Sequence, residues 1–63
     1  MPITLKSARI NTGLTQAQAA KEIGITKDTL SNYERGKSYP DVPIIKKIEK
    51  VYGIPYSDIK FLL

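Results

Sequence analysis

Glycine placement restricts the possible folds of this chain more than any other feature. Apolar residues recur at helical spacing in short segments, and these segments are separated by four glycines, Gly13, Gly24, Gly36 and Gly53. No segment shows the alternation of apolar and polar residues that is typical of a half-buried strand. The sequence therefore predicts an all-α fold built from short helices.

The means of stabilising such a fold are limited. The chain has 63 residues and contains neither cysteine nor histidine. A disulfide is therefore impossible, and the usual ligands of a structural zinc ion are missing. At this length there is room for one domain with one small core, which depends on close helix packing. We predict a single domain over residues 1–63, without a metal ion or another cofactor.

Capping signals set the expected bounds of five helices. Thr4, Thr26 and Asp41 are suitable N-caps, and Thr15 and Gln18 have the spacing of a capping box. The glycines end four of the helices. The expected helices cover about residues 5–12, 16–23, 27–35, 42–52 and 56–62.

The charge balance favours a polyanionic partner. Ten Lys and Arg residues against six Asp and Glu give a net charge of +4, and a basic protein attracts nucleic acid or an anionic membrane surface. No apolar run approaches the ~18 residues of a transmembrane helix. The start, MPITLK, lacks the apolar stretch of a signal peptide, so we expect a cytoplasmic protein.

Groups that could carry catalysis are scarce. The chain has no His, no Cys and no Gly-rich phosphate loop. Its serines Ser7, Ser31 and Ser38 have no base expected beside them. We therefore expect neither an enzymatic activity nor a small-molecule ligand.

Residues 15–36, TQAQAAKEIGITKDTLSNYERG, bring two of the expected helices close together. Ala20 stands where a larger side chain would hold the helices apart. Gly24 supplies the left-handed residue that a short turn between steeply crossed helices needs. Leu30 and Tyr33 turn the second helix inward. This is the pattern of a helix-turn-helix.

The sequence resembles the Cro/CI-type (Xre-like) helix-turn-helix family of DNA-binding phage repressors and bacterial regulators. The resemblance lies in LTQAQAAKEIGI, TKDTLSNYERG and YPDVPIIKKIEKVYGIP, and it covers nearly the whole chain. It implies a compact five-helix domain like that of lambda repressor. Ala8 departs from the family pattern, which usually has a larger aliphatic residue, and we expect Tyr33, Tyr52 or Phe61 to fill the space. Glu49 stands where a small residue is usual, and we expect it to be more exposed.

The family resemblance also implies a function. The chain would be a sequence-specific double-stranded DNA-binding transcriptional regulator, acting as a repressor. It would bind a two-half-site operator as a homodimer, with the helix at about residues 27–35 in the major groove. The alternative is an antitoxin-like or adaptor module that acts through protein–protein interaction.

Four polar residues lie on the exposed face of this third helix and are candidates for reading bases: Lys27, Asp28, Ser31 and Asn32. Lys27 can reach guanine O6 and N7, and Asn32 can pair with adenine N6 and N7. Asp28 can accept from cytosine N4, or it can stabilise the helix dipole at the start of the helix. The alternative for the whole set is a solvated helix face.

Phosphate contacts are expected on both sides of this face. Gln16 stands at the start of the second helix, where amide N–H groups can meet a phosphate, although a plain helix-start residue is the alternative. Thr26 and Thr29 have short hydroxyl side chains suited to a phosphate. The family resemblance adds the residues that follow the recognition helix, Arg35, Gly36, Lys37 and Ser38.

Two further sets of charged residues receive other roles. The resemblance implies that Arg9 and Glu34 form a structural ion pair between the first and third helices. Lys46, Lys47 and Lys50 lie on the polar side of the fourth helix. We expect these lysines to form a solvated face, with phosphate contact as the alternative.

The tail, IPYSDIKFLL, has more apolar residues than one helix face can dock. Ile59 and Leu62 are expected to dock on the core, which leaves Phe61 and Leu63 for an interface. The matching region of the family is commonly the dimer contact, so we expect a weak homodimer that forms mostly on DNA. The alternative is that Phe61 fills the gap beside Ala8. The chain is either a complete Cro-like protein or the N-terminal domain of a longer repressor.

Overall fold

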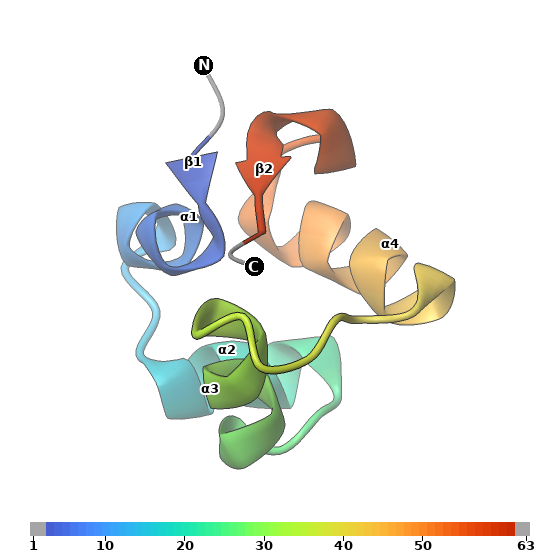
Figure 1. The fold of residues 1–63 in the computed structure, drawn as a ribbon. Coiled ribbons are helices and arrows are strands. Elements are labelled where there is room, and N and C mark those ends of the chain that lie inside the picture. The colour runs from blue at the N-terminus through green and yellow to red at the C-terminus, as the bar shows by residue number, and fades with distance from the viewer. Residues whose placement is uncertain (1–2, 62–63) are drawn as a thin grey trace.

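A computed structural model describes residues 3–61 of the chain. Four α-helices make up most of this range, and two short strands pair at one end of the molecule (Figure 1). The elements are β1 (Ile3–Thr4), α1 (Leu5–Thr12), α2 (Gln16–Ile23), α3 (Lys27–Glu34), α4 (Val42–Tyr52), a 3₁₀ helix (Tyr56–Asp58) and β2 (Ile59–Lys60).

Local side-chain caps explain where the helices begin. Thr4, Thr15, Thr26 and Asp41 each precede a helix, and each accepts a hydrogen bond from the amide three residues later at 3.1 Å. The capping box is complete, because the Gln18 side chain also accepts from the Thr15 amide at 2.9 Å. The predicted starts of the four α-helices are confirmed, and α3 ends at Glu34, one residue earlier than expected.

Helices α2 and α3 contact each other across a short turn. Gly24 ends α2 with φ at +91°, a left-handed conformation that residues with a Cβ rarely adopt. Ala20 is buried and Leu30 is fully buried, as the helix-turn-helix pattern predicts. In Figure 1 this pair forms the end of the molecule opposite the strands, and α4 lies to one side.

The core lies where the four α-helices and β2 meet. Tyr52 is buried in the same cluster as Ala8, while Tyr33 and Phe61 pack against it. All three aromatic residues expected near Ala8 thus belong to, or pack against, the core that contains it. The buried apolar residues are Leu5, Ala8, Ala19, Ala20, Ile23, Leu30, Ile48, Tyr52 and Ile59.

The expected fifth helix at residues 56–62 is wrong, and so is the expected absence of strands. Only Tyr56–Asp58 forms a helical turn, of the 3₁₀ type, after which the chain extends into β2. Ile59 pairs in parallel with Ile3, and Lys60 with Thr4. Within the described residues the domain thus has four α-helices and a two-stranded sheet. The pairing partner stands at the other end of the sequence, where a local pattern cannot indicate it.

Candidate nucleic-acid interface

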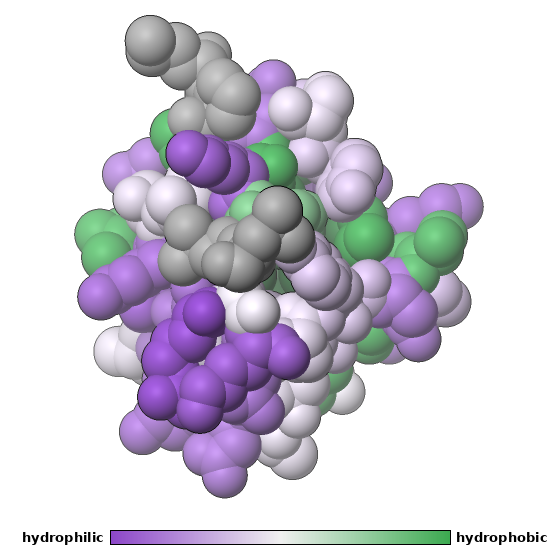
Figure 2. Space-filling view, in the orientation of Figure 1, coloured by the Kyte–Doolittle hydropathy of each residue, from purple (hydrophilic) through white to green (hydrophobic). Residues whose placement is uncertain are grey.

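The polar face of α3 carries the four residues that we expect to read bases. Lys27 and Asp28 are exposed, and Ser31 and Asn32 are half-buried. Within residues 3–61 none of these side chains has a hydrogen-bond or ion-pair partner, so their polar groups are open to a ligand. Figure 2 shows hydrophilic side chains gathered over the part of the surface formed by α2 and α3.

Thr26 and Thr29 have a structural role at the start of α3. The Thr26 hydroxyl oxygen accepts from the Thr29 amide at 3.1 Å, and the two hydroxyl oxygens are 2.7 Å apart. One of the two hydroxyl protons forms that contact, and the other can be donated elsewhere. The two threonines therefore cap the helix and still offer one donor to a phosphate.

The segment after α3 is held against the end of the helix. The Arg35 amide donates to the Ser31 carbonyl at 3.0 Å, and the Lys37 amide donates to the Asn32 carbonyl at 2.9 Å. Arg35, Lys37 and Ser38 are exposed, and Gly36 is half-buried. The bonds thus hold the backbone of two cationic residues, Arg35 and Lys37, at the end of α3.

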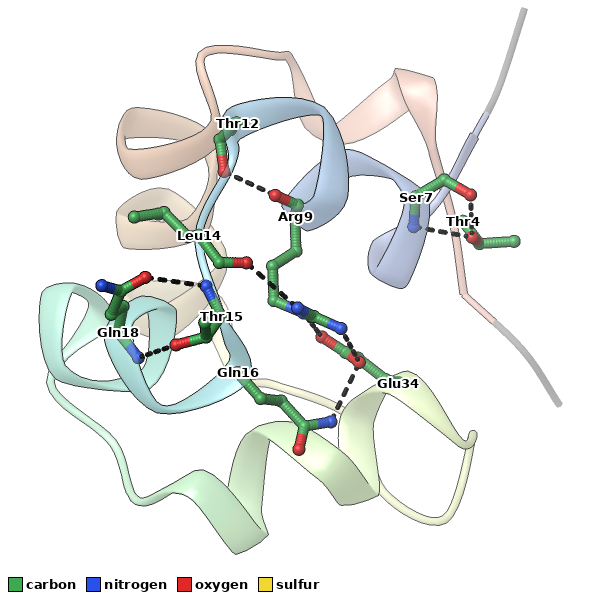
Figure 3. Close-up of polar contacts among 9 residues, drawn as sticks. All are labelled: Thr4, Ser7, Arg9, Thr12, Leu14, Thr15, Gln16, Gln18 and Glu34. Atoms are coloured by element: carbon green, nitrogen blue, oxygen red, sulfur yellow. Dashed lines mark hydrogen bonds and ion pairs between the residues drawn. The ribbon is translucent and has the colours of Figure 1, made fainter.

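The ion pair that the resemblance implies is present. Arg9 Nε and Glu34 Oε2 are 2.7 Å apart, and the two side chains are only 12% and 3% exposed. Arg9 Nη1 also donates to the Leu14 carbonyl at 3.0 Å (Figure 3). One guanidinium therefore joins α1, the loop before α2 and the last residue of α3, and it fixes how these elements meet.

Gln16 extends this network to the start of α2. Its Nε2 donates to Glu34 Oε1 at 3.1 Å, which sequence reasoning did not predict (Figure 3). The amide group has a second N–H and a carbonyl oxygen, so the bond does not exhaust its capacity. Gln16 is half-buried. The bond holds its amide at the junction of α2 and α3.

A groove of about 460 Å³ opens over this network. Its walls come from α1, the start of α2 and one side of α3, and its charged residues are Lys6, Arg9, Lys27, Glu34 and Arg35. Of these, Lys6 was not predicted as a site residue. Nothing in the sequence distinguishes Lys6, because a lysine on the outer face of an amphipathic helix is commonplace.

Tyr52 places a buried hydroxyl near the ion pair. The pKa of Tyr52 is raised to about 12, mainly by burial and next by the nearby Glu34 carboxylate, while Arg9 acts in the opposite direction. Among residues 3–61 the Tyr52 hydroxyl has no hydrogen-bond partner. The phenol is therefore held in its neutral form at physiological pH.

Comparison with known families agrees with this geometry. The family model described as "Helix-turn-helix" matches residues 5–59. That range includes all four α-helices and the residues of the groove. The chain belongs to the Cro/CI-type helix-turn-helix family. This family consists of DNA-binding transcription regulators.

Individual relatives are regulators from phages, bacteria and archaea. The chain is 31% identical over 55 residues to the cryptic phage CTXphi transcriptional repressor RstR of Vibrio cholerae. The matched region covers 87% of this chain and 50% of the relative. The chain is 40% identical over 50 residues to the HTH-type transcriptional regulator ImmR of Bacillus subtilis, covering 79% and 39%. It is 36% identical over 55 residues to the HTH-type transcriptional regulator MJ0272 of Methanocaldococcus jannaschii, covering 87% and 83%.

The coverage differs between these relatives. The chain spans half or less of the length of RstR and ImmR, but most of the length of MJ0272. No solved structure matches the chain significantly. The helix-turn-helix unit is therefore what this chain shares with all three relatives.

The described part of the chain is also informative about membranes and metal ions. Its longest helix, α4, has 11 residues, whereas about 20 apolar residues are needed to cross a bilayer. Accordingly, no helix within residues 3–61 is long and apolar enough to span a membrane. The same residues contain no group of three or more acidic side chains that could hold a metal ion.

The lysines of α4 face a different part of the surface. Lys47 and Lys50 line a second groove, between α2 and α4, together with the apolar residues Leu14, Ile23 and Val51. Lys46 is exposed. None of the three lines the groove beside the polar face of α3.

The structure tests the expectations for some of the tail residues. Ile59 is buried, as expected. Phe61 is half-buried, packs against the core, and lies with its ring centroid 6.2 Å from that of Tyr39 and 5.7 Å from that of Tyr56. Leu62 and Leu63 lie outside the described residues. The three aromatic rings form one cluster that includes two exposed tyrosines, Tyr39 and Tyr56.

Proposed function

We propose that this chain binds double-stranded DNA sequence-specifically and represses transcription, and that it is not an enzyme. The observation that supports the proposal best is the polar face of α3. Four polar side chains there have no partner among residues 3–61, and a groove with cationic walls lies beside them. In a helix-turn-helix, the second helix enters the major groove and presents such side chains to base edges.

Roles follow from the chemistry of the side chains. Lys27 and Asn32 match the acceptors of guanine and the paired donor and acceptor of adenine, and Ser31 can bond either base. Asp28 either accepts from cytosine or stabilises the start of α3. Phosphates on the two sides are bound by Gln16, Thr26 and Thr29, and by the segment 35–38, because these residues flank the polar face.

A homodimer would place two copies of α3 on one face of the duplex. Two-fold symmetric binding requires half-sites about one helical turn, roughly 34–36 Å, apart. The aromatic cluster at Phe61 supports an interface in this region, because it exposes Tyr39 and Tyr56 beside a half-buried ring. The small size of this aromatic cluster implies a dimer that forms mostly on DNA. We propose Leu63 as a second residue of the same dimer interface.

The test of the recognition face is a specificity measurement. Selection of bound fragments from a random duplex library first gives the preferred site. Asn32→Ala should then weaken binding to that site by about 1–3 kcal/mol and change binding to random DNA little. Fluorescence anisotropy at fixed salt measures both affinities.

Asn11→Ala is the matched control, because Asn11 is an exposed asparagine on α1 that does not line the groove. It should leave both affinities unchanged. A uniform loss for Asn32→Ala on every sequence would remove Asn32 from the base-reading set. Absence of any preferred site for the wild-type chain would overturn sequence-specific binding.

The dimer has its own test. Phe61→Ala should weaken binding to a duplex with two half-sites and leave binding to a single half-site nearly intact. An equal loss on both duplexes, together with a lower melting temperature, would mean that Phe61 belongs only to the core.

A further inference from the structure

The groove over the ion pair collects positive charge from two helices. Lys6 comes from α1, Lys27 is the first residue of α3, and Arg35 directly follows α3, about two helical turns beyond Lys27. All three side chains are exposed. In the described range, no carboxylate lies within ion-pair distance of any of them. The three cations therefore face a common space without a counter-ion from the protein.

The acidic residue in this groove is already neutralised. Glu34 is buried, and its Oε2 accepts from Arg9 Nε at 2.7 Å. Its Oε1 accepts from Gln16 Nε2 at 3.1 Å and from Arg9 Nη2 at 3.4 Å. Because Arg9 balances this carboxylate, the net charge that the groove presents is that of the three exposed cations.

The amino end of α2 opens into the same groove. Thr15, Gln16 and Ala17 line it. The amides of Gln16 and Ala17 stand in the first turn, where a helix has no acceptor of its own. The Gln18 amide, by contrast, is capped by Thr15. Two uncapped amide groups thus add donors to the three cations, and such a set suits a singly charged phosphodiester.

We propose that Lys6 is a DNA-backbone contact, and that it binds one phosphate in this groove together with Arg35 and the amino end of α2. This inference rests on the proposed function, and it extends the DNA-binding surface from the helix-turn-helix to α1. The phosphate lies over the Arg9–Glu34–Gln16 network, which holds the three helices at the spacing that the site needs.

Salt dependence of DNA binding tests the role of Lys6. Each phosphate contact contributes about 0.9 to the slope of log Kobs against log salt concentration. Lys6→Gln should reduce the slope by about that amount per protomer and weaken binding to preferred and random duplexes by the same factor. Lys6→Arg keeps the charge and should retain the wild-type slope.

Lys21→Gln is the matched control, because Lys21 is an exposed lysine of α2 outside the groove. It removes the same net charge, so its effect measures long-range attraction alone. Equal slopes for Lys6→Gln and Lys21→Gln would overturn the Lys6 contact. If Lys37→Ala still reduced the slope, the proposed function would stand without it, whereas a wild-type chain that bound no duplex would refute both.

Discussion

The Arg9–Glu34 ion pair should contribute far more to stability than a surface salt bridge. The two side chains are 12% and 3% exposed, so removal of either partner leaves the other charge largely shielded from water. Loss of one partner of a buried pair costs about 3–5 kcal/mol, compared with about 0–1 kcal/mol at the surface. Arg9→Leu should cost more than Glu34→Leu. Each stranded residue would keep one neutral hydrogen-bond partner, Gln16 for Glu34 and the Leu14 carbonyl for Arg9, so the deeper burial of Glu34 decides the order.

A double-mutant cycle separates the pair from its surroundings. The variant with both Arg9→Leu and Glu34→Leu should lose much less stability than the sum of the single variants, with a coupling energy of about 2 kcal/mol or more. Because a domain of this size has a total stability of roughly 3–5 kcal/mol, the urea titrations require a fixed concentration of a stabilising osmolyte. Circular dichroism reports the unfolding. Coupling within about 0.5 kcal/mol of zero would refute this account of the pair.

Three further predictions concern stability. Burial raises the pKa of Tyr52 to about 12 from 10.0, so between these pH values the unfolded chain releases the phenol proton first. Stability should therefore fall by roughly 2–3 kcal/mol over this range in urea titrations of the wild-type chain, and by less in Tyr52→Phe. Gly24→Ala should lower the free energy of unfolding by about 1–2 kcal/mol. The cause is backbone strain at a φ of +91° and not a clash, since the added Cβ would meet only Lys47 Nζ at 3.7 Å. An unchanged melting temperature would contradict this. Asp41→Ala should lower the free energy of unfolding by about 1 kcal/mol through loss of the α4 cap, and an unchanged value in urea titrations would contradict this.

The helix boundaries were predictable because their signals are local. The Thr15 hydroxyl needs only the amide of Gln18, three residues away, and Gly24 needs only its own backbone freedom. The tail was mispredicted because its partners lie outside the tail segment. The Glu49 carboxylate accepts from the Tyr56 amide at 2.6 Å, and Ile59 pairs with Ile3. Neither contact can be inferred from the tail sequence alone.

The candidate site likewise contains some residues that local sequence patterns predict and others that they do not. The polar face of α3 follows from helical spacing within one segment, so Lys27 and Asn32 could be chosen from the sequence. The bond from Gln16 to Glu34 and the position of Lys6 in the same groove as Arg35 depend on how three helices pack. Such packing is a tertiary property, and no spacing within one helix encodes it.

The pairing of β1 with β2 has a consequence for the order of folding. Ile3 and Ile59 stand 56 positions apart, so their contact closes a loop that contains nearly the whole domain. Closing a flexible loop of that length costs roughly 3–4 kcal/mol in chain entropy, whereas the turn between α2 and α3 joins close neighbours. The ladder is therefore expected to form only after the helices have collapsed and shortened the loop. By the same reasoning, the amides of β1 and β2 should exchange their hydrogens through a local opening that leaves α2 and α3 intact.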